Sequence, residues 1–286
     1  MSRRRAQSGL AAHVVEASRP VVLIRGGGDL ATGVAARLHR SGFAVVILEV
    51  PRPLAVRRLV ALAEAVYVGQ VEIEDLRGLV CLSAEAARAA LVDGWIPVVV
   101  DPEAECRHLL QPAALVDARM RKAPPELGLE AAPFVVGLGP GFTAGVDCHA
   151  VVETQRGHHL GRVLWHGQAA ADTGLPEPVA GFDRERILRA PASGRIEASR
   201  PLGALVRRGE EVARVGGAPL LAPFDGALRG LMHDGLEVAA GDKIGDLDPR
   251  AVPIYCFEIS DKALAVGGGV LEALLSQPEI RRQLRG

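Results

Sequence analysis

Two glycine-rich stretches carry the residues of this sequence that are best suited to bind an anion. Gly26, Gly28 and Ala31 fit the spacing G-x-G-x-x-G/A, in which glycines allow a tight turn and let a phosphate approach the backbone. The candidates of the second stretch are Gly139, Gly141 and Thr143. Both stretches follow apolar runs, so two such loops at adjacent strand ends would enclose one ligand.

Acidic residues accompany the first motif. Glu49 lies close to the ~20-residue offset at which dinucleotide-binding folds place the carboxylate that binds ribose hydroxyls. Asp29 follows the glycines, where it either competes with a phosphate for the same amide donors or caps the helix. One alternative to another anionic ligand is therefore NAD, in an NAD-dependent oxidoreductase, although the sequence shows no evident pair of residues for proton transfer. The other alternative is that the glycines only form a tight turn and bind no ligand.

Further charged residues lie close to these motifs in the chain. Arg57 follows the second apolar strand, at the end where open α/β sheets bind ligands, and a guanidinium suits phosphate or carboxylate. A later turn is dense in titratable groups, among them Glu153, Arg156 and His158. These groups either contribute to a site or face solvent. No recognised spacing of metal ligands accompanies them, so no metal is predicted.

The elements that must position these residues read as an α/β unit. Apolar runs at 21–24, 44–48, 96–100 and 134–138 are typical of strands buried on both faces of a parallel sheet. The spacing of leucines and valines predicts a helix over 30–40. We therefore expect a Rossmann-like domain at 20–186, preceded by a flexible tail at 1–19.

The chain changes character after residue 186 and contains an internal repeat. Ala190-Pro191 returns as Ala222-Pro223, 32 positions later, and glycines and valines recur at the same offset. This pattern predicts a small all-β barrel-sandwich module at 187–250, similar to biotinyl and lipoyl carriers. Its central junction contains no lysine, so neither biotin nor lipoate is expected. We expect a strand at 254–259 and a later helix, within 251–286, to rejoin the α/β domain.

Composition narrows the functional classes. The 286 residues are 49% hydrophobic and 23% charged, with a formal net charge of −1, which gives no basis for nucleic-acid binding. Cys81, Cys106, Cys148 and Cys256 are scattered, as in reduced cytosolic proteins. No run approaches the ~20 apolar residues of a membrane span. We expect a cytoplasmic protein, either monomeric or a homo-oligomer.

Several short segments of the sequence, taken together, resemble one protein family. They are GGGDLATG (26–33), PLAVR (53–57), GPGFTAGVD (139–147), ETQRGHHLGR (153–162), KIGDLDPR (243–250) and SDK (260–262). They resemble the selenium-dependent molybdenum hydroxylase accessory family, and the Rossmann part is loosely similar to xanthine dehydrogenase accessory proteins.

The resemblance implies a role in molybdenum cofactor biosynthesis and molybdenum hydroxylase maturation. The paired glycine loops would hold a nucleotide or molybdopterin-type ligand, and the partner would be the hydroxylase apo-enzyme or another maturation protein. A non-enzymatic scaffold that docks partners is a further alternative. Whether the chain catalyses a reaction stays open.

Overall fold

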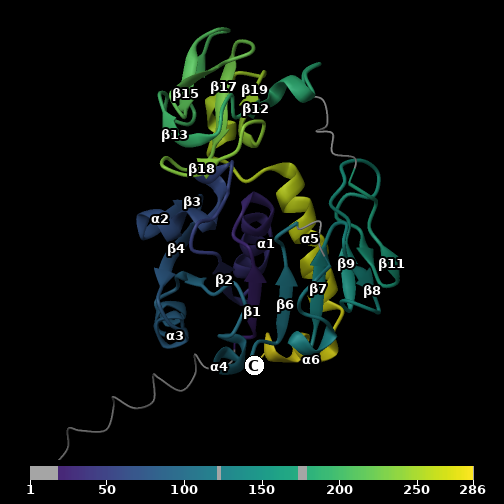
Figure 1. Ribbon diagram of the computed structural model, residues 1–286. Helices are drawn as coiled ribbons and strands as arrows, with labels where there is room; N and C mark the ends of the chain where they lie inside the picture. The colour runs from purple at the N-terminus through teal and green to yellow at the C-terminus, as the bar shows by residue number, and fades with distance from the viewer. Residues whose placement is uncertain (1–18, 121–123, 173–178, 286) are drawn as a thin grey trace, which may run out of the picture.

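The computed structural model describes residues 19–120, 124–172 and 179–285, so nearly all of the expected tail at 1–19 lies outside the described residues. A nine-stranded sheet forms the centre, in the order β10-β9-β7-β6-β1-β2-β5-β4-β3 (Figure 1). Its strands are β1 (Val21–Arg25), β2 (Ala44–Glu49), β3 (Gln70–Ile73), β4 (Leu76–Cys81), β5 (Ile96–Val100), β6 (Ala114–Asp117), β7 (Val135–Leu138), β9 (Ala150–Val152) and β10 (Val163–Leu164).

Helices and short ribbons cover the sheet. The helices are α1 (Asp29–Arg40), α2 (Ala65–Val68), α3 (Ala84–Val92), α4 (Arg107–Leu110), α5 (Asp261–Leu275) and α6 (Pro278–Gln283). The 3₁₀ turns are η1 (Arg58–Val60), η2 (Leu62–Glu64), η3 (Leu129–Ala131), η4 (Arg184–Arg186) and η5 (Pro253–Cys256). A two-stranded ribbon pairs β8 (Thr143–Ala144) with β11 (Gly167–Gln168). Within the described ranges, no helix is both long and apolar enough to cross a membrane.

Alternate residues of the strands pack into different layers. Val22 and Ile24 of β1 belong to a buried cluster with α1 and α5, whereas Leu23 packs with α3 on the opposite face. A strand places successive side chains on opposite faces, so a sheet covered on both sides needs an unbroken apolar run. The wholly buried β2 meets this requirement.

Helices α1 and α5 pack closely and run in the same direction. A Cβ on Gly267 would lie 2.5 Å from the carbonyl oxygen of Gly33, so the two backbones touch. One turn further along α1, Arg37 donates from Nε to the Leu264 carbonyl at 3.2 Å. The amino-terminal ends of both helices therefore lie side by side beyond the carboxyl end of β1.

Residues 187–248 form two four-stranded antiparallel sheets, ordered β12-β19-β17-β14 and β16-β15-β13-β18. Their strands are β12 (Ile187–Arg189), β13 (Gly194–Ala198), β14 (Leu205–Val206), β15 (Glu211–Val215), β16 (Ala218–Leu221), β17 (Gly226–Leu231), β18 (Glu237–Val238) and β19 (Lys243–Asp248). The short strand of each repeat pairs with the other repeat, because β14 joins β17 and β18 joins β13. Figure 1 shows these strands at the end of the molecule where α5 begins.

The predicted fold class, a Rossmann-like parallel sheet with a barrel-sandwich module, is wrong. The protein is α/β with a large mixed sheet, in which β3 and β10 run antiparallel to their neighbours. Each of these edge strands is joined to its partner without a crossover helix, and such connections give antiparallel pairs. The strand expected at 254–259 is also wrong, because this segment begins with the 3₁₀ helix η5.

Candidate functional site

The start of α1 leaves helix donors exposed to a ligand. Its N-cap is Gly28, which has no side chain to bind them, and a Cβ at this position would meet nothing within 4 Å. Asp29 binds only the next amide, with Oδ1 3.0 Å from the Leu30 nitrogen. At the start of α5, by contrast, the Ser260 hydroxyl caps the helix by accepting from the Ala263 amide at 3.2 Å. Both helices direct the positive ends of their dipoles to this place.

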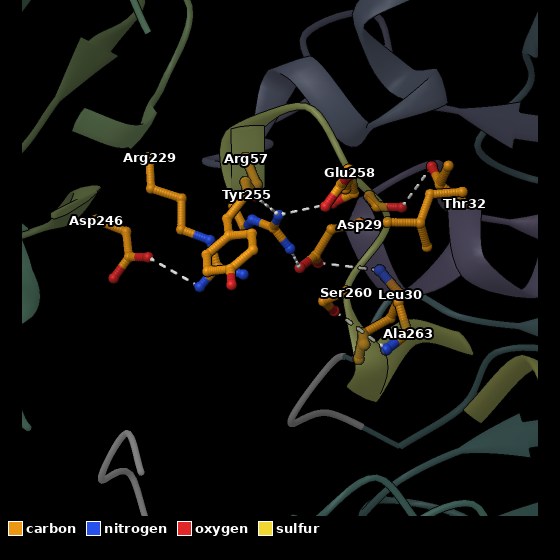
Figure 2. A network of polar contacts seen from close by, with 12 residues as sticks. Asp29, Leu30, Thr32, Arg57, Arg229, Asp246, Tyr255, Glu258, Ser260 and Ala263 are labelled. Atoms are coloured by element: carbon orange, nitrogen blue, oxygen red, sulfur yellow. Dashed lines mark hydrogen bonds and ion pairs between the residues drawn. The ribbon is translucent and has the colours of Figure 1, made fainter. Parts of the chain in front are cut away.

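Arg57 connects this place to the segment that precedes α5. Its Nη1 lies 3.4 Å from Asp29 Oδ2, and its Nη2 donates to the carbonyls of Tyr255 and Glu258 at 3.2 and 3.3 Å (Figure 2). The side chain is only 9% exposed, yet its Nε has no hydrogen-bond partner among the residues that the structure describes. A buried donor without a partner costs about 1–3 kcal/mol, so this atom calls for an explanation.

Arg229 is a second arginine with an unmatched donor. It sits at the register shift of β17 against β19, a bulge that redirects its side chain. Its Nη1 lies 3.8 Å from Asp246 and 3.7 Å from Asp248, while its buried Nε has no hydrogen-bond partner within residues 19–120, 124–172 and 179–285. Burial, together with the positive charge of Arg57, lowers the pKa of Arg229. The two guanidinium groups are therefore close enough to repel each other.

An ion pair completes the site on the α5 side. Arg156 donates from Nη1 and Nη2 to the two carboxylate oxygens of Asp261 at 2.7 and 2.6 Å. These hydrogen bonds hold the pKa of Asp261 well below its usual range. We call Gly28, Asp29, Arg57, Arg156, Arg229 and Asp261 the helix-start cluster. It combines two helix dipoles with three guanidinium groups, an arrangement that can bind an anion.

Glu49 is not placed to bind ribose hydroxyls. Its carboxylate, 9% exposed, accepts from the backbone amides of Gly27 at 2.6 Å and Val50 at 2.9 Å. Burial raises the pKa of Glu49, although these two hydrogen bonds oppose the rise. The carboxylate thus closes the first glycine turn and occupies an amide that a phosphate in this turn would need.

The two glycine loops do not enclose a common space. A Cβ on Gly26 would lie 3.2 Å from Arg119 Cγ, and one on Gly139 would lie 3.0 Å from Met120 Cε. Arg119 and Met120 therefore lie between the loops. Both glycines have positive φ, 89° at Gly26 and 70° at Gly139, which L side chains rarely adopt.

The remaining predicted residues have structural partners or face solvent. Gly141 turns the chain with φ of 100°. Thr143 accepts from Gln168 Nε2 at 2.8 Å in the ribbon, on the sheet face away from α1. Glu153 accepts hydrogen bonds from the amides of Gln155 and Ala170, each at 2.7 Å. Ala31 is buried in the core, and His158 is exposed. Of the predicted residues, the structure brings together Gly28, Asp29, Arg57 and Arg156.

A second arginine cluster lies at the ends of β1 and β6. Arg25, 2% exposed, lies 3.5 Å from Asp117 and 3.4 Å from Glu126, and donates to the Pro102 carbonyl at 2.7 Å. Arg119 donates to the same two carboxylates at 2.6 Å each. We call Arg25, Asp117, Arg119 and Glu126 the strand-end cluster.

Sequence reasoning missed Arg229, Tyr255 and the start of α5. A signal for Arg229 exists in the sequence, because it interrupts the apolar strand 226–231 while Asp246 and Asp248 alternate in the partner strand. The start of α5 carries its own signal, since Ser260 precedes Asp261 in the order expected of an N-cap and first turn.

Thiols and metal-ligand groups do not add to the site. The four cysteines are free and buried, and burial raises the pKa of Cys148 to about 11 and that of Cys106 to about 12. Such thiols stay protonated at neutral pH. In residues 19–120, 124–172 and 179–285, no three His, Cys, Asp or Glu residues are grouped so that they could hold a metal ion.

Comparisons with known proteins give one relative of close sequence and several distant structures. No family model matches the chain. A relative from Escherichia coli (strain K12), named "Uncharacterized protein YqeB", is 45% identical over 255 residues, which are 89% of this chain and 47% of the relative. The chain thus spans about half the length of the curated relative it matches.

The similar solved structures share little sequence with this chain. An aspartoacylase family protein from Mesorhizobium loti is 8% identical with a TM-score of 0.25, covering 80% of this chain and 84% of that one. A succinylglutamate desuccinylase from Silicibacter sp. is 14% identical with a TM-score of 0.23, covering 80% and 85%. At these TM-scores the likeness carries no argument about function.

These findings correct the expected family and function. No family model matches, and the name of the relative points to neither molybdenum, selenium nor a nicotinamide-dependent enzyme. Assignment to the molybdenum hydroxylase accessory family, with its maturation role, is therefore wrong. The NAD-dependent oxidoreductase is wrong too, and the bonds of Glu49 to Gly27 and Val50 give the physical reason.

Proposed function

We propose that this chain binds a small molecule bearing a phosphate group at the helix-start cluster. The observation that carries the proposal is the Nε of Arg57, a buried guanidinium donor without a partner in the described part of the chain. An anion placed against Arg57 and Arg229 would offset both the missing hydrogen bonds and the repulsion between the two charges. The uncapped start of α1 supplies further donors.

The space for such a group lies beside Gly28. No atom would contact a Cβ at this position within 4 Å, so a ligand can approach the backbone there. Asp29 occupies the same region but is weakly held, because its contact to Arg57 is 3.4 Å long and its side chain is 37% exposed. We expect Asp29 to turn toward solvent when an anion takes its place.

Phosphate suits this site better than a monovalent anion. It carries several acceptor oxygens, which can bind helix amides and more than one guanidinium together. The position beyond the carboxyl ends of parallel strands is where open α/β sheets bind ligands. The sequence leads us to expect a nucleotide as one class of ligand, and this stays a proposal. A protein partner or a homo-oligomer likewise stays a proposal.

The test is isothermal titration calorimetry with inorganic phosphate and pyrophosphate, at ionic strength held constant with sodium chloride. We expect saturable binding that Arg57→Met abolishes. Arg195→Met is the matched control, because Arg195 pairs with Glu237 in an exposed ion pair outside the cluster. Equal binding by Arg57→Met and the unaltered chain, or no binding of either anion, would refute the proposal.

A further inference from the structure

A short segment beside the helix-start cluster exposes large apolar side chains. Ile254 is 53%, Tyr255 39% and Phe257 46% exposed, all within or next to η5. Neighbouring apolar side chains that are each 39% or more exposed mark a candidate contact surface. Arg57 ties this segment to the site, because its Nη2 binds the backbone carbonyls of Tyr255 and Glu258.

The two aromatic rings differ in what holds them. Phe257 packs against the chain at Gly203, where an added Cβ would come within 2.9 Å of its ring. The Tyr255 ring instead lies under the guanidinium of Arg250, 4.6 Å from the ring centroid. Figure 2 shows Tyr255 drawn with Arg57, Arg229 and Asp29. Tyr255 is therefore an oriented, partly exposed ring whose own backbone binds the arginine of the anion site.

We infer that the ligand carries a flat aromatic ring as well as its phosphate, as a nucleoside monophosphate does, and that this ring stacks on Tyr255. The inference rests on the proposed function, since the phosphate at Gly28 and Arg57 sets the position of the rest of the molecule. Stacking on an aromatic side chain accepts any heterocyclic base, because every base has a π-face. A tyrosine side chain has only two χ angles, so ordering it on a ligand costs little conformational entropy for the contact area that it gains.

The test compares adenosine 5′-monophosphate with ribose 5-phosphate by calorimetry, since the second probe keeps the sugar and the phosphate but carries a hydroxyl in place of the base. Stacking of a base on an aromatic side chain strengthens binding, so we expect the nucleotide to bind roughly 5- to 150-fold tighter than ribose 5-phosphate. Tyr255→Ala should remove this preference and leave the affinity for ribose 5-phosphate unchanged. Arg57 binds a backbone carbonyl of residue 255, so this substitution leaves the arginine contact in place.

Two further variants sharpen the result. Tyr255→Phe keeps the ring and should keep the preference, whereas Ile254→Ala removes a neighbouring exposed side chain and should change nothing. Equal affinity of the unaltered chain for both probes, or a preference that survives in Tyr255→Ala, would overturn the stacking role while leaving the phosphate site intact. Failure of both probes to bind would refute the proposed function and the stacking role together.

Discussion

The strand-end cluster and the helix-start cluster both contain buried arginines, but they differ in how these arginines are matched. In the strand-end cluster, Arg25 and Arg119 share the carboxylates of Asp117 and Glu126. In the helix-start cluster, Arg57 and Arg229 each have a buried Nε that finds no partner among the described residues. The guanidinium groups of the strand-end cluster hold the strand ends together through ion pairs. Those of the helix-start cluster keep hydrogen-bond donors that a ligand could use.

This difference separates structure from function among residues of one type. A buried ion pair contributes little net stability but costs several kcal/mol when one partner is removed. A buried guanidinium with unused donors already carries part of that cost in the folded protein. The comparison predicts that stability depends most on the strand-end cluster and that anion binding depends on the helix-start cluster.

The largest effect is expected for Asp117→Asn. It would leave Arg25, which is 2% exposed, with one carboxylate fewer in a setting that water cannot reach. We expect a loss of about 3–5 kcal/mol in the free energy of unfolding, measured by urea denaturation. Phosphate binding by the folded fraction should be unchanged. Glu237→Gln, in an exposed pair with Arg195, is the control and should shift stability by under about 0.5 kcal/mol.

Adjacent glycines of the first turn should respond differently to alanine. A Cβ at Gly27 would lie 2.8 Å from the Ala63 nitrogen, so we expect Gly27→Ala to cost about 1–3 kcal/mol by overpacking. Gly28→Ala meets open space at a φ of −67° and should change stability by under about 0.5 kcal/mol. Gly28→Leu should likewise fold but weaken phosphate binding, because its side chain fills the proposed ligand space. Undiminished binding by Gly28→Leu would place the ligand elsewhere.

Arg57→Met tests the other side of the comparison. The change removes a charge whose hydrogen bonds are incomplete and keeps much of the apolar volume, so we expect a loss of only about 1 kcal/mol on thermal unfolding. The stabilisation that saturating phosphate gives to the unaltered chain should disappear. A loss as large as that of Asp117→Asn would show that the two clusters do not differ.

The smallest effect concerns pH and the pair Arg156–Asp261. The pKa of Asp261 is lowered by hydrogen bonds from Arg156, so the pair stabilises the folded state above the unfolded-state value of 3.8. This contribution is lost as the pH falls below 3.8 and the carboxylate protonates. Because Asp261 is largely exposed, we expect Arg156→Gln to lower the free energy of unfolding by only about 0.5 kcal/mol at pH 7. At a pH low enough to protonate Asp261 in the folded protein, the substitution should have no effect. A difference between the two proteins that stays constant with pH would contradict this role.

The sequence predicts the central strands and α1 because local rules decide them. Apolar runs at 21–24 and 44–48 correspond to β1 and β2, and the helix expected at 30–40 is α1 with one more residue. The glycines at 267–269 mislead, since they look like a turn but lie inside α5. Gly267 is needed for tertiary packing, because a side chain at this position would collide with α1. The local sequence does not reveal this contact.

The candidate site is only partly visible in the sequence for a similar reason. Gly28, Asp29 and Arg57 belong to motifs near one βα unit, so spacing identifies them. Arg229 and Tyr255 reach the same place from distant segments, and only tertiary contacts with residues 56–58 bring them there. Glu49 fits its motif by spacing, yet hydrogen bonds to Gly27 and Val50 give it another role.

The close packing of α1 on α5 also constrains how the chain can fold during synthesis. α1 begins at residue 29 and α5 at residue 261, so the starts of two helices whose backbones touch lie 232 positions apart. A ribosome delivers the amino-terminal segment first, and contacts of such long separation form slowly. The face of α1 at Gly33 therefore stays uncovered until residues 261–275 have been made, and a chain truncated before residue 261 would leave it exposed.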